Sequence, residues 1–422
     1  MNLSVRNREL FYFYATIVFL MMCVSNRTLY TNHIPDTFVM LLGFISLLFF
    51  VFFLSCKKNH TYFMVIFSVG IMCLLITIKY FDSSVYRAII ILGNFSLLSS
   101  IVLLSSVDKK ALLDFLSKIL FCILTISLIG WLFHLVGFTM PVLENVDLNN
   151  DVHNLNNHYI YYDNAYVLAN VFPRFRGIFI EPGQLATPCV FLFFARGAVL
   201  KDKTNILLLL VIFFSFSLAG YITLIVGLFL FYLFAERKYK IARILGLLLI
   251  IGTTTFYIVK NANQDNPLLN LIIERLEYDK DLGVTGNNRS DTTFDIYYDQ
   301  YVRSDKIFFG MGDEIKVGNT SWTNHASGIK KFFVYYGVFG VMNMIMLTLL
   351  LLKVYYCRST IVFFVVIWLA FLVRDMLQTQ FWLTLAILGF HNLKRIDSFK
   401  KIESCTVTQN ETSVLRKIQS NL

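Results

Sequence analysis

Two arginines, a glycine and a glutamate stand close together where one apolar run of this sequence begins. They are Arg174, Arg176, Gly177 and Glu181 of RFRGIFIEPG. A guanidinium group binds phosphate through two parallel hydrogen bonds and keeps its charge in proteins. A carboxylate can take a proton from an attacking hydroxyl. This stretch is therefore typical of a site that holds a phosphate-bearing lipid head group beside a reacting hydroxyl.

A second polar segment later in the chain carries residues of the same kinds. Arg289 lies in GNNRSD, and His325 lies in SWTNHASG just before another apolar run. Fixed positive charges stabilise a leaving diphosphate, and a histidine is a second candidate for the proton acceptor. We therefore expect the three arginines to bind a lipid diphosphate and Glu181 and His325 to be the catalytic groups. The chemistry would be glycosyl transfer from a lipid-diphosphate donor to a sugar hydroxyl.

Each of these residues also has a simpler interpretation. Arginines at a membrane boundary reach lipid head groups without any catalytic role. Glu181 followed by Pro182 is a pattern of helix starts, because an acid is favourable at the positive end of the helix dipole. A lone His325 is commonly an interfacial residue with its hydrogen bonds satisfied. The arrangement of the residues therefore carries the hypothesis, and no single residue does.

The elements that must position these residues are apolar helices. Of the 422 residues, 57% are hydrophobic and 15% are charged, whereas soluble proteins carry about 25% charged residues. Twelve apolar runs are each long enough to approach a crossing of the ~30 Å hydrocarbon core. We predict an all-α polytopic membrane protein with about 12 transmembrane helices in a single domain over 1–422. The runs are 9–25, 35–55, 61–79, 88–106, 112–137, 184–200, 204–218, 219–235, 241–259, 329–352, 359–374 and 377–392.

Basic residues cluster at alternate connections, which fixes the expected orientation. By the positive-inside rule both termini are cytoplasmic, including a tail over 393–422. Two sizeable loops, 138–184 and 260–328, are then extracytoplasmic and carry net charges of −3 and −4. All five candidate site residues fall in these loops, so we expect the active site on the extracytoplasmic side. The overall charge of +10 reflects topology and requires no nucleic-acid partner.

The remaining motifs predict no cofactor. The seven cysteines lie in apolar runs, at the ends of such runs or in the tail, so they indicate neither a disulfide framework nor a metal site. The sequence contains no Walker loop and no dinucleotide-binding fingerprint.

The combined pattern resembles a known family. Many transmembrane helices, two outer loops, RxRGxFxEP entering a helix, a later arginine with a Gly310-x-Gly312 turn, and a histidine before a GVFG helix resemble the Wzy-type O-antigen and capsular polysaccharide polymerases. These polymerases share a broader family with the O-antigen ligases. The resemblance in topology covers nearly the whole chain, and its motifs are confined to 172–187 and 286–340.

The resemblance implies a multi-pass enzyme of the bacterial inner (plasma) membrane. It would be a metal-independent glycosyltransferase that moves a growing glycan from undecaprenyl diphosphate to a sugar hydroxyl of another lipid-linked repeat unit. Arg174, Arg176 and Arg289 would contact the diphosphate, Glu181 would support the site, and His325 resembles the histidine proposed as the base in the ligases. The implied partners are the undecaprenyl-diphosphate-linked oligosaccharide, membrane lipid and a chain-length regulator protein.

Three other functions fit parts of the pattern. One is a polysaccharide-binding or sensor protein, whose arginines at the membrane entry would bind ligand without turnover. An O-antigen ligase would transfer the glycan to lipid A core, and a flippase would carry a lipid-linked oligosaccharide across the membrane. Transporters tend to show internal repeats and charges deep inside their helices. Here the polar residues concentrate on one face, which favours an enzyme that acts outside the membrane.

Overall fold

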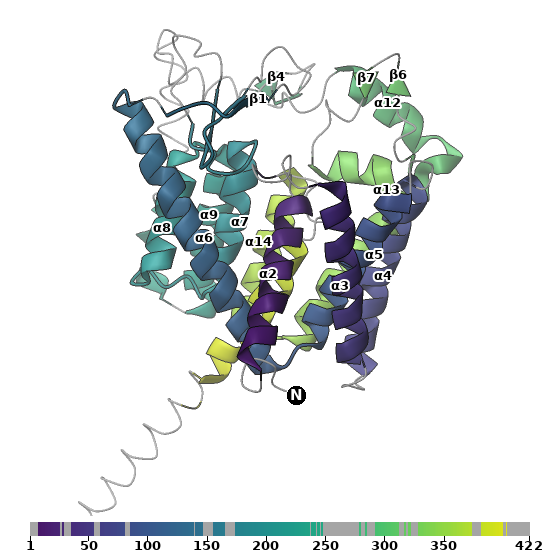
Figure 1. The fold of residues 1–422 in the computed structure, drawn as a ribbon, viewed down its shortest axis with the longest axis horizontal. Coiled ribbons are helices and arrows are strands. Elements are labelled where there is room, and N and C mark those ends of the chain that lie inside the picture. The colour runs from purple at the N-terminus through teal and green to yellow at the C-terminus, as the bar shows by residue number, and fades with distance from the viewer. Residues whose placement is uncertain are drawn as a thin grey trace, which may run out of the picture.

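The computed structural model places apolar helices side by side in a bundle, with short strands at one end (Figure 1). We call the end that carries the strands β1–β3 and helix α12 the loop end. The structure describes residues 7–25, 28, 35–54, 60–80, 85–138, 140–146, 155–164, 174–236, 238–241, 243–244, 246–247, 278–279, 283–284, 292–311, 316–317, 320–321, 328–373, 381–399 and 402.

The helices of the described residues follow most of the predicted apolar runs. A further helix covers 381–399 and ends at the end of the bundle opposite the loop end, where α2 begins (Figure 1). The other helices are α2 (Arg8–Ser25), α3 (Asp36–Leu54), α4 (His60–Tyr80), α5 (Val85–Leu103), α6 (Ser106–Leu135), α7 (Pro182–Ala195), α8 (Lys203–Phe214), α9 (Leu218–Leu230) with the π-helical turn η2 (Phe231–Ala235), α12 (Thr292–Val302), α13 (Gly328–Val354) and α14 (Arg358–Val373).

The helices pack as two groups. In one group α5 packs against α3 and α4, and α4 packs against α13; in the other α7 contacts α8, α9 and α14. α3 and α5 meet at two glycines, where a Cβ atom added to Gly93 would lie 2.5 Å from the Cα of Gly43. Ser68 of α4 donates to the side-chain oxygen of Asn343 of α13 at 2.8 Å, and the Asn343 amide donates back to the Ser68 carbonyl at 2.9 Å. Small residues and buried polar pairs are typical of helix contacts inside membranes.

The surface of the bundle is apolar over its helices. Large hydrophobic side chains stand exposed along them, for example Leu48 at 68% and Met342 at 59%. Water-soluble proteins rarely expose such continuous apolar surface. Among the described residues, four helices are long and apolar enough to cross a membrane, and shorter apolar helices lie among them. The chain is therefore built as a helical membrane protein. Twelve crossings remain a prediction, since most of 241–259 lies outside the described residues.

The predicted division of the run 204–235 into two short helices agrees with the structure. α8 and α9 form a hairpin whose turn comprises 215–217, and Phe216 adopts a positive φ of 47° there. Ser217 caps α9 through its side chain, which accepts from the amide of Gly220.

Two helix boundaries differ from the prediction. α6 begins at Ser106 and not at 112, because the Ser105 side chain caps the helix by accepting from the Asp108 amide. Lys109 therefore lies inside the helix, buried, and donates to the carbonyl of Val102 and the hydroxyl of Tyr355. The last helix continues to 399, seven residues into the predicted tail.

The predicted helix 329–352 is broken near its start. α13 changes direction at Gly337, which has φ 66° and ψ −167°. Figure 1 shows the first part of α13 lying across the top of the bundle, while the rest descends through it. At 1.5 Å per residue, the continuous helix 338–354 is about 26 Å long, which is near the thickness of the hydrocarbon core.

The loop end carries short strands that the sequence analysis did not predict. β1 (Glu144–Val146), β2 (Leu155–Asn157) and β3 (Tyr162–Asn164) form an antiparallel sheet in which Asp163 lies opposite Asn156. The second predicted loop contributes α12, the 3-10 turn η3 (Asp305–Ile307), and the two-stranded sheets β4 (Tyr278–Asp279) with β5 (Gly283–Val284) and β6 (Lys316–Val317) with β7 (Thr320–Ser321).

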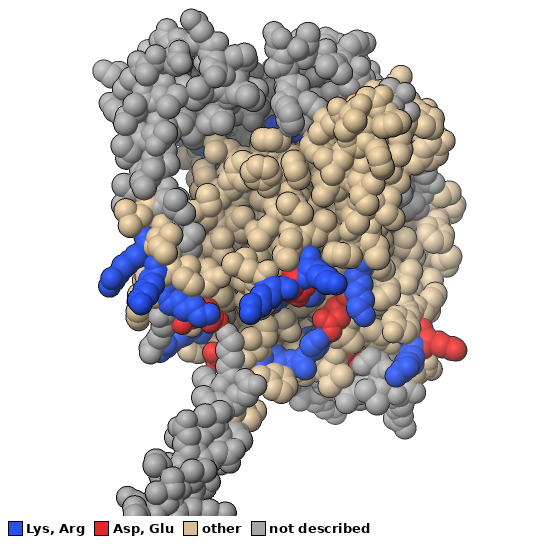
Figure 2. Space-filling model, turned by 90° about the vertical axis from the view of Figure 1, so that its left-hand side faces the viewer, with Lys and Arg blue, Asp and Glu red and all other residues tan. Residues whose placement is uncertain are grey.

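Charged residues are unevenly distributed over the molecule. On the face drawn in Figure 2, the Lys and Arg side chains gather in a band near the end opposite the loop end. The segments between α7 and α8 and after η2, which hold Lys201, Lys203, Lys238 and Lys240, lie at that end. The cytoplasmic location of this end stays a prediction.

Candidate functional site

Arg174 holds the turn between α8 and α9. Its Nε donates to the carbonyl of Ser215 at 3.3 Å and its Nη2 to that of Phe216 at 2.8 Å. The backbone of the arginine segment also contacts the end of α8, since the Phe175 amide donates to the carbonyl of Phe214 at 3.0 Å. The last carbonyls of a helix have no partner within it and carry the negative end of its dipole. A guanidinium group is therefore well suited to this position.

Arg176 is the buried arginine of the pair. Only 9% of it is exposed, and its Nη1 donates to the carbonyl of Ile180 at 2.7 Å across a tight turn. Gly177 supplies the positive φ of 54° that this turn requires. Burial lowers the pKa of Arg176, whereas the charges of Glu181 and Asp163 raise it. The side chain is thus a buried cation balanced by two carboxylates.

Glu181 is the residue at which α7 begins. Its backbone is extended, with φ −118° and ψ 141°, and Pro182 follows in the first turn. Its carbonyl accepts from the amides of Gln184 and Leu185, while its side chain is exposed. The predicted helix start is confirmed. The carboxylate stands at the positive end of the helix and acts on the Arg176 guanidinium at the same time.

Asp163 and His134 form a pair beside the Arg176 guanidinium. The Nε2 of His134, near the end of α6, lies 2.9 Å from the Oδ2 of Asp163 on β3. The Tyr162 amide donates to the carbonyl of Gly177 at 2.9 Å, so β3 runs directly beside the arginine segment. This contact brings Asp163, which follows Tyr162, close to Arg176, which precedes Gly177. Asp163 is thereby placed beside Arg176.

Aromatic rings enclose this pair. His158 stacks on Tyr161 with 4.8 Å between ring centroids, and its Nδ1 lies 3.1 Å from the Met140 carbonyl. Burial, together with the charge of Asp163, raises the pKa of Tyr161 to about 12, so its hydroxyl stays protonated at neutral pH. In the described part of the chain the Tyr161 hydroxyl, the Nε2 of His158 and the Nδ1 of His134 are buried without a hydrogen-bond partner. Buried polar atoms of this kind are suited to water or a polar ligand.

Thr28, which follows α2, is joined to the arginine segment. Thr28, just after α2, forms an isolated antiparallel bridge with Phe179 and is buried. Phe179 also packs edge-on against Phe381 at the start of the last helix, with 5.8 Å between ring centroids. Residues from the beginning, middle and end of the chain therefore fix the segment between Arg176 and Glu181.

The second loop is seated on the break in α13. The Met311 amide donates to the carbonyl of Val334 at 2.7 Å, and the Phe339 amide donates to that of Phe308 at 3.1 Å. The Tyr301 hydroxyl of α12 adds a bond to the Phe333 carbonyl at 2.8 Å. A broken helix in a membrane needs such partners for the backbone groups that it frees.

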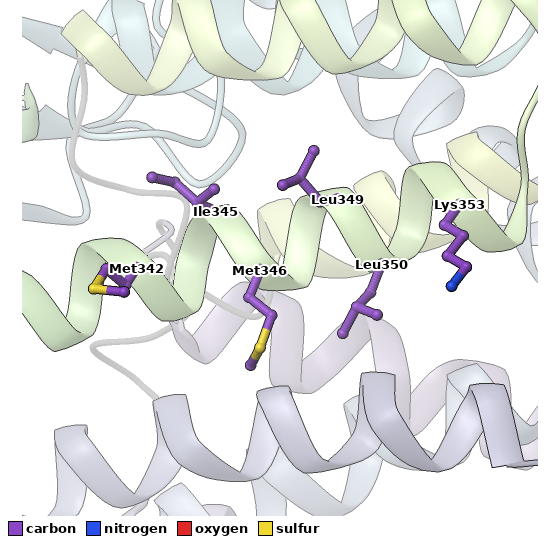
Figure 3. A pocket seen from close by; sticks show the side chains of 6 residues that line it. All are labelled: Met342, Ile345, Met346, Leu349, Leu350 and Lys353. Atoms are coloured by element: carbon purple, nitrogen blue, oxygen red, sulfur yellow. The ribbon is translucent and has the colours of Figure 1, made fainter.

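An apolar groove lies elsewhere, along the descending part of α13. It has a volume of about 430 Å³, and Figure 3 shows Lys353 at one end, with Met346 and Leu350 pointing toward a neighbouring helix. Its lining residues are Met342, Ile345, Met346, Leu349, Leu350 and Lys353. A shallow apolar groove on a membrane helix is suited to a lipid chain, and Lys353 at its end is the one titratable group among its lining residues.

The structure brings together three of the five predicted site residues. Arg174, Arg176 and Glu181 lie on one segment at the loop end, and they differ in burial and in hydrogen-bond partners. Arg289 and His325 lie outside the described residues, so their convergence with this segment remains a prediction.

Two residues of the site were missed by the sequence analysis. His134 lies inside a predicted apolar helix, and Asp163 was counted only as one acid of the first loop. A histidine near the outer end of an apolar run was an available signal. The pairing was not visible, because 28 residues separate the two positions. Within the described ranges, no group of three or more His, Cys, Asp or Glu side chains is placed to hold a metal ion.

Comparison with known proteins does not add to this description. The chain matches no protein-family model, no curated protein and no solved structure. A functional conclusion must therefore rest on the residues themselves.

Proposed function

We propose that this protein is a bacterial inner-membrane glycosyltransferase, an oligosaccharide polymerase that acts on the extracytoplasmic side. It transfers a growing glycan from undecaprenyl diphosphate to a sugar hydroxyl of another lipid-linked repeat unit. The observation that carries the proposal is the buried guanidinium of Arg176 at the loop end, balanced by the carboxylates of Glu181 and Asp163.

The charge balance at Arg176 supports an anionic substrate. A buried cation is costly unless it is paired, and a planar guanidinium pairs with phosphate as well as with carboxylate. A diphosphate that reaches Arg176 takes over the role of one carboxylate. The carboxylate released in this way is then next to the reacting groups and can accept a proton.

The reaction that follows is balanced in atoms and charge. The acceptor hydroxyl oxygen forms a bond to the anomeric carbon of the donor glycan, and the bond from that carbon to the diphosphate oxygen breaks. The leaving undecaprenyl diphosphate takes the electron pair, and Arg176 with Arg289 stabilises its charge. The hydroxyl proton passes to Glu181 or to His325.

The two neighbouring arginines have different parts in this proposal. Two donor groups of Arg174 are bound to backbone carbonyls of the α8–α9 turn. Arg176 lies beside the carboxylates of Glu181 and Asp163, and its Nη1 donates to the carbonyl of Ile180. Arg176 is therefore the principal diphosphate ligand, and Arg174 supports the segment while adding positive charge.

Alanine and lysine substitutions at Arg176 test the proposal. In a strain whose own gene for this protein is deleted, Arg176→Ala should leave single-repeat products in place of long glycan chains on a gel of surface glycan. Arg176→Lys should rescue poorly, because an ammonium group cannot form the bidentate fork. Arg303→Ala is the matched control, since Arg303 is an exposed arginine of the second loop. Immunoblots of membranes should show equal protein in all variants.

The same gel separates the alternative functions. Normal chain lengths with Arg176→Ala would refute the assignment of this residue. In the deletion strain, capped single repeats indicate a polymerase, unattached polymer indicates a ligase, and loss of all external repeats indicates a flippase. Arg289→Ala and His325→Ala extend the test to the two predicted residues outside the described ranges.

A further inference from the structure

The Arg176 guanidinium has two carboxylate neighbours that differ in how firmly they are held. Glu181 is exposed at the start of α7. Asp163 is buried, at 8% exposure, and its Oδ2 is 2.9 Å from the Nε2 of His134. A single site for a substrate diphosphate thus has one carboxylate open to solvent and one enclosed by protein.

His134 fixes Asp163 to a rigid part of the bundle. His134 lies in the last turn of α6. Trp131, three residues earlier on the same helix, packs against Phe175, the residue between the two arginines, with 5.4 Å between ring centroids. An ordered imidazole that donates to a carboxylate sets the direction of that carboxylate, as second-layer partners do in many enzyme sites. Asp163 consequently keeps its place relative to α6.

The strand that carries Asp163 is also fixed to the arginine segment. The bond from the Tyr162 amide to the Gly177 carbonyl, 2.9 Å long, joins the two backbones beside Asp163 and Arg176. Gly130 of α6 leaves room for this arrangement, because a Cβ atom there would lie 2.6 Å from the Ile160 side chain. The imidazole, the carboxylate and the guanidinium therefore lie in sequence from α6 to the arginine segment.

We propose that His134 and Asp163 are positioning residues that keep the Arg176 guanidinium oriented for the diphosphate, which leaves the exposed Glu181 to serve the reacting hydroxyl. This inference rests on the proposed function and assigns its parts. Asp163 stays with Arg176 when the diphosphate binds, whereas Glu181 is the carboxylate that is displaced. Loss of the pair should weaken binding of the donor, and loss of Glu181 should slow transfer.

Binding of a soluble diphosphate to the purified full-length protein in detergent tests the inference. The probe is farnesyl diphosphate, with farnesol as the uncharged reference. Asp163→Asn keeps the shape and removes the charge, and His134→Phe removes the donor. Each should raise the Kd for farnesyl diphosphate about tenfold, the effect of losing roughly one charge-assisted hydrogen bond. His134→Gln, whose amide nitrogen can replace Nε2, should bind within about threefold of wild type.

Glu181→Gln gives the second half of the test. It should bind farnesyl diphosphate at least as tightly as the wild type does, because it no longer competes for Arg176, and yet fail to restore long glycan chains in the deletion strain. Thermal unfolding in the same detergent shows whether each variant is folded, and Asp163→Asn replaces His134→Phe if the latter is unfolded.

The possible results separate this inference from the proposed function. Unchanged or tighter binding by folded Asp163→Asn, with weaker binding by Arg176→Ala, would overturn the role of the pair and leave the diphosphate site in place. Unchanged binding by Arg176→Ala itself would remove the diphosphate site and the inference together. Weak binding by His134→Gln, comparable with that of His134→Phe, would contradict an action through the donated hydrogen bond.

Discussion

Gly310 and Gly337 are in direct backbone contact. A Cβ atom added to Gly337 would lie 2.6 Å from the amide nitrogen of Gly310 and 2.4 Å from the carbonyl oxygen of Phe308. Both glycines have positive φ, 77° at Gly310 and 66° at Gly337. The turn glycine of the second loop and the first glycine of the GVFG segment are therefore partners in one junction between loop and membrane helix.

Substitution of either glycine by alanine should destabilise the protein. A side chain would strain the positive φ, at a cost of order 1–3 kcal/mol, and would meet backbone atoms that cannot move aside. Gly337→Ala and Gly310→Ala should lower the thermal unfolding temperature in detergent. Gly246→Ala is the control, because a Cβ atom there would have only ordinary contacts with the Phe229 ring. Equal unfolding temperatures for all three variants would show that an added methyl group does not strain the contact between Gly310 and Gly337.

Replacement of Arg174 should act on stability more than replacement of Arg176 does. Arg174→Ala removes the donors to the Ser215 and Phe216 carbonyls and should cost about 1–3 kcal/mol, as for hydrogen bonds from charged groups. The measurement is thermal unfolding in detergent, with Arg303→Ala as the exposed control. A larger loss of stability in Arg176→Ala than in Arg174→Ala would contradict the structural part given to Arg174.

Alkaline pH should destabilise the small sheet through its tyrosines. Burial, with a contribution from Glu144, raises the pKa of Tyr162 from 10.0 to about 12. The folded state therefore keeps the phenol proton that the unfolded chain loses above pH 10. This contribution to stability is complete below that pH and disappears as the pH approaches 12.

Tyr162→Phe should therefore flatten the fall of the unfolding temperature between about pH 10 and 12, because it has no hydroxyl to ionise. Tyr159→Phe, at an exposed position of the same turn, should leave the slope as in wild type. An equally steep fall in both variants would mean that another group causes it.

The membrane helices were predictable because their signal is local. Runs of apolar residues need no partner to be recognised, and the start of α7 at Glu181-Pro182 follows from the preferences of a helix N-terminus. The ends of helices were less predictable. Lys109 falls between the predicted runs 88–106 and 112–137, but the cap at Ser105 and the Tyr355 hydroxyl allow the lysine to lie within α6.

The site was predictable only in its contiguous part. Arg174, Arg176 and Glu181 stand together in the sequence, so their proximity required no knowledge of the fold. Their different surroundings did require it, since the carbonyls that bind Arg174 belong to a hairpin turn 41 and 42 residues away. The contact of His134 with Asp163 depends on a short sheet whose polar strands have no apolar alternation to reveal them.

The bridge between Thr28 and Phe179 has a practical consequence for anyone who labels this protein. The segment that follows α2 is a natural choice for an epitope or fluorophore, because it is close to the start of the chain. An insertion there would disturb the bridge to Phe179 and with it the segment between Arg176 and Glu181, so the tag would reduce activity. The helix over 381–399 ends at the opposite end of the bundle, so a tag attached after this helix is the safer choice.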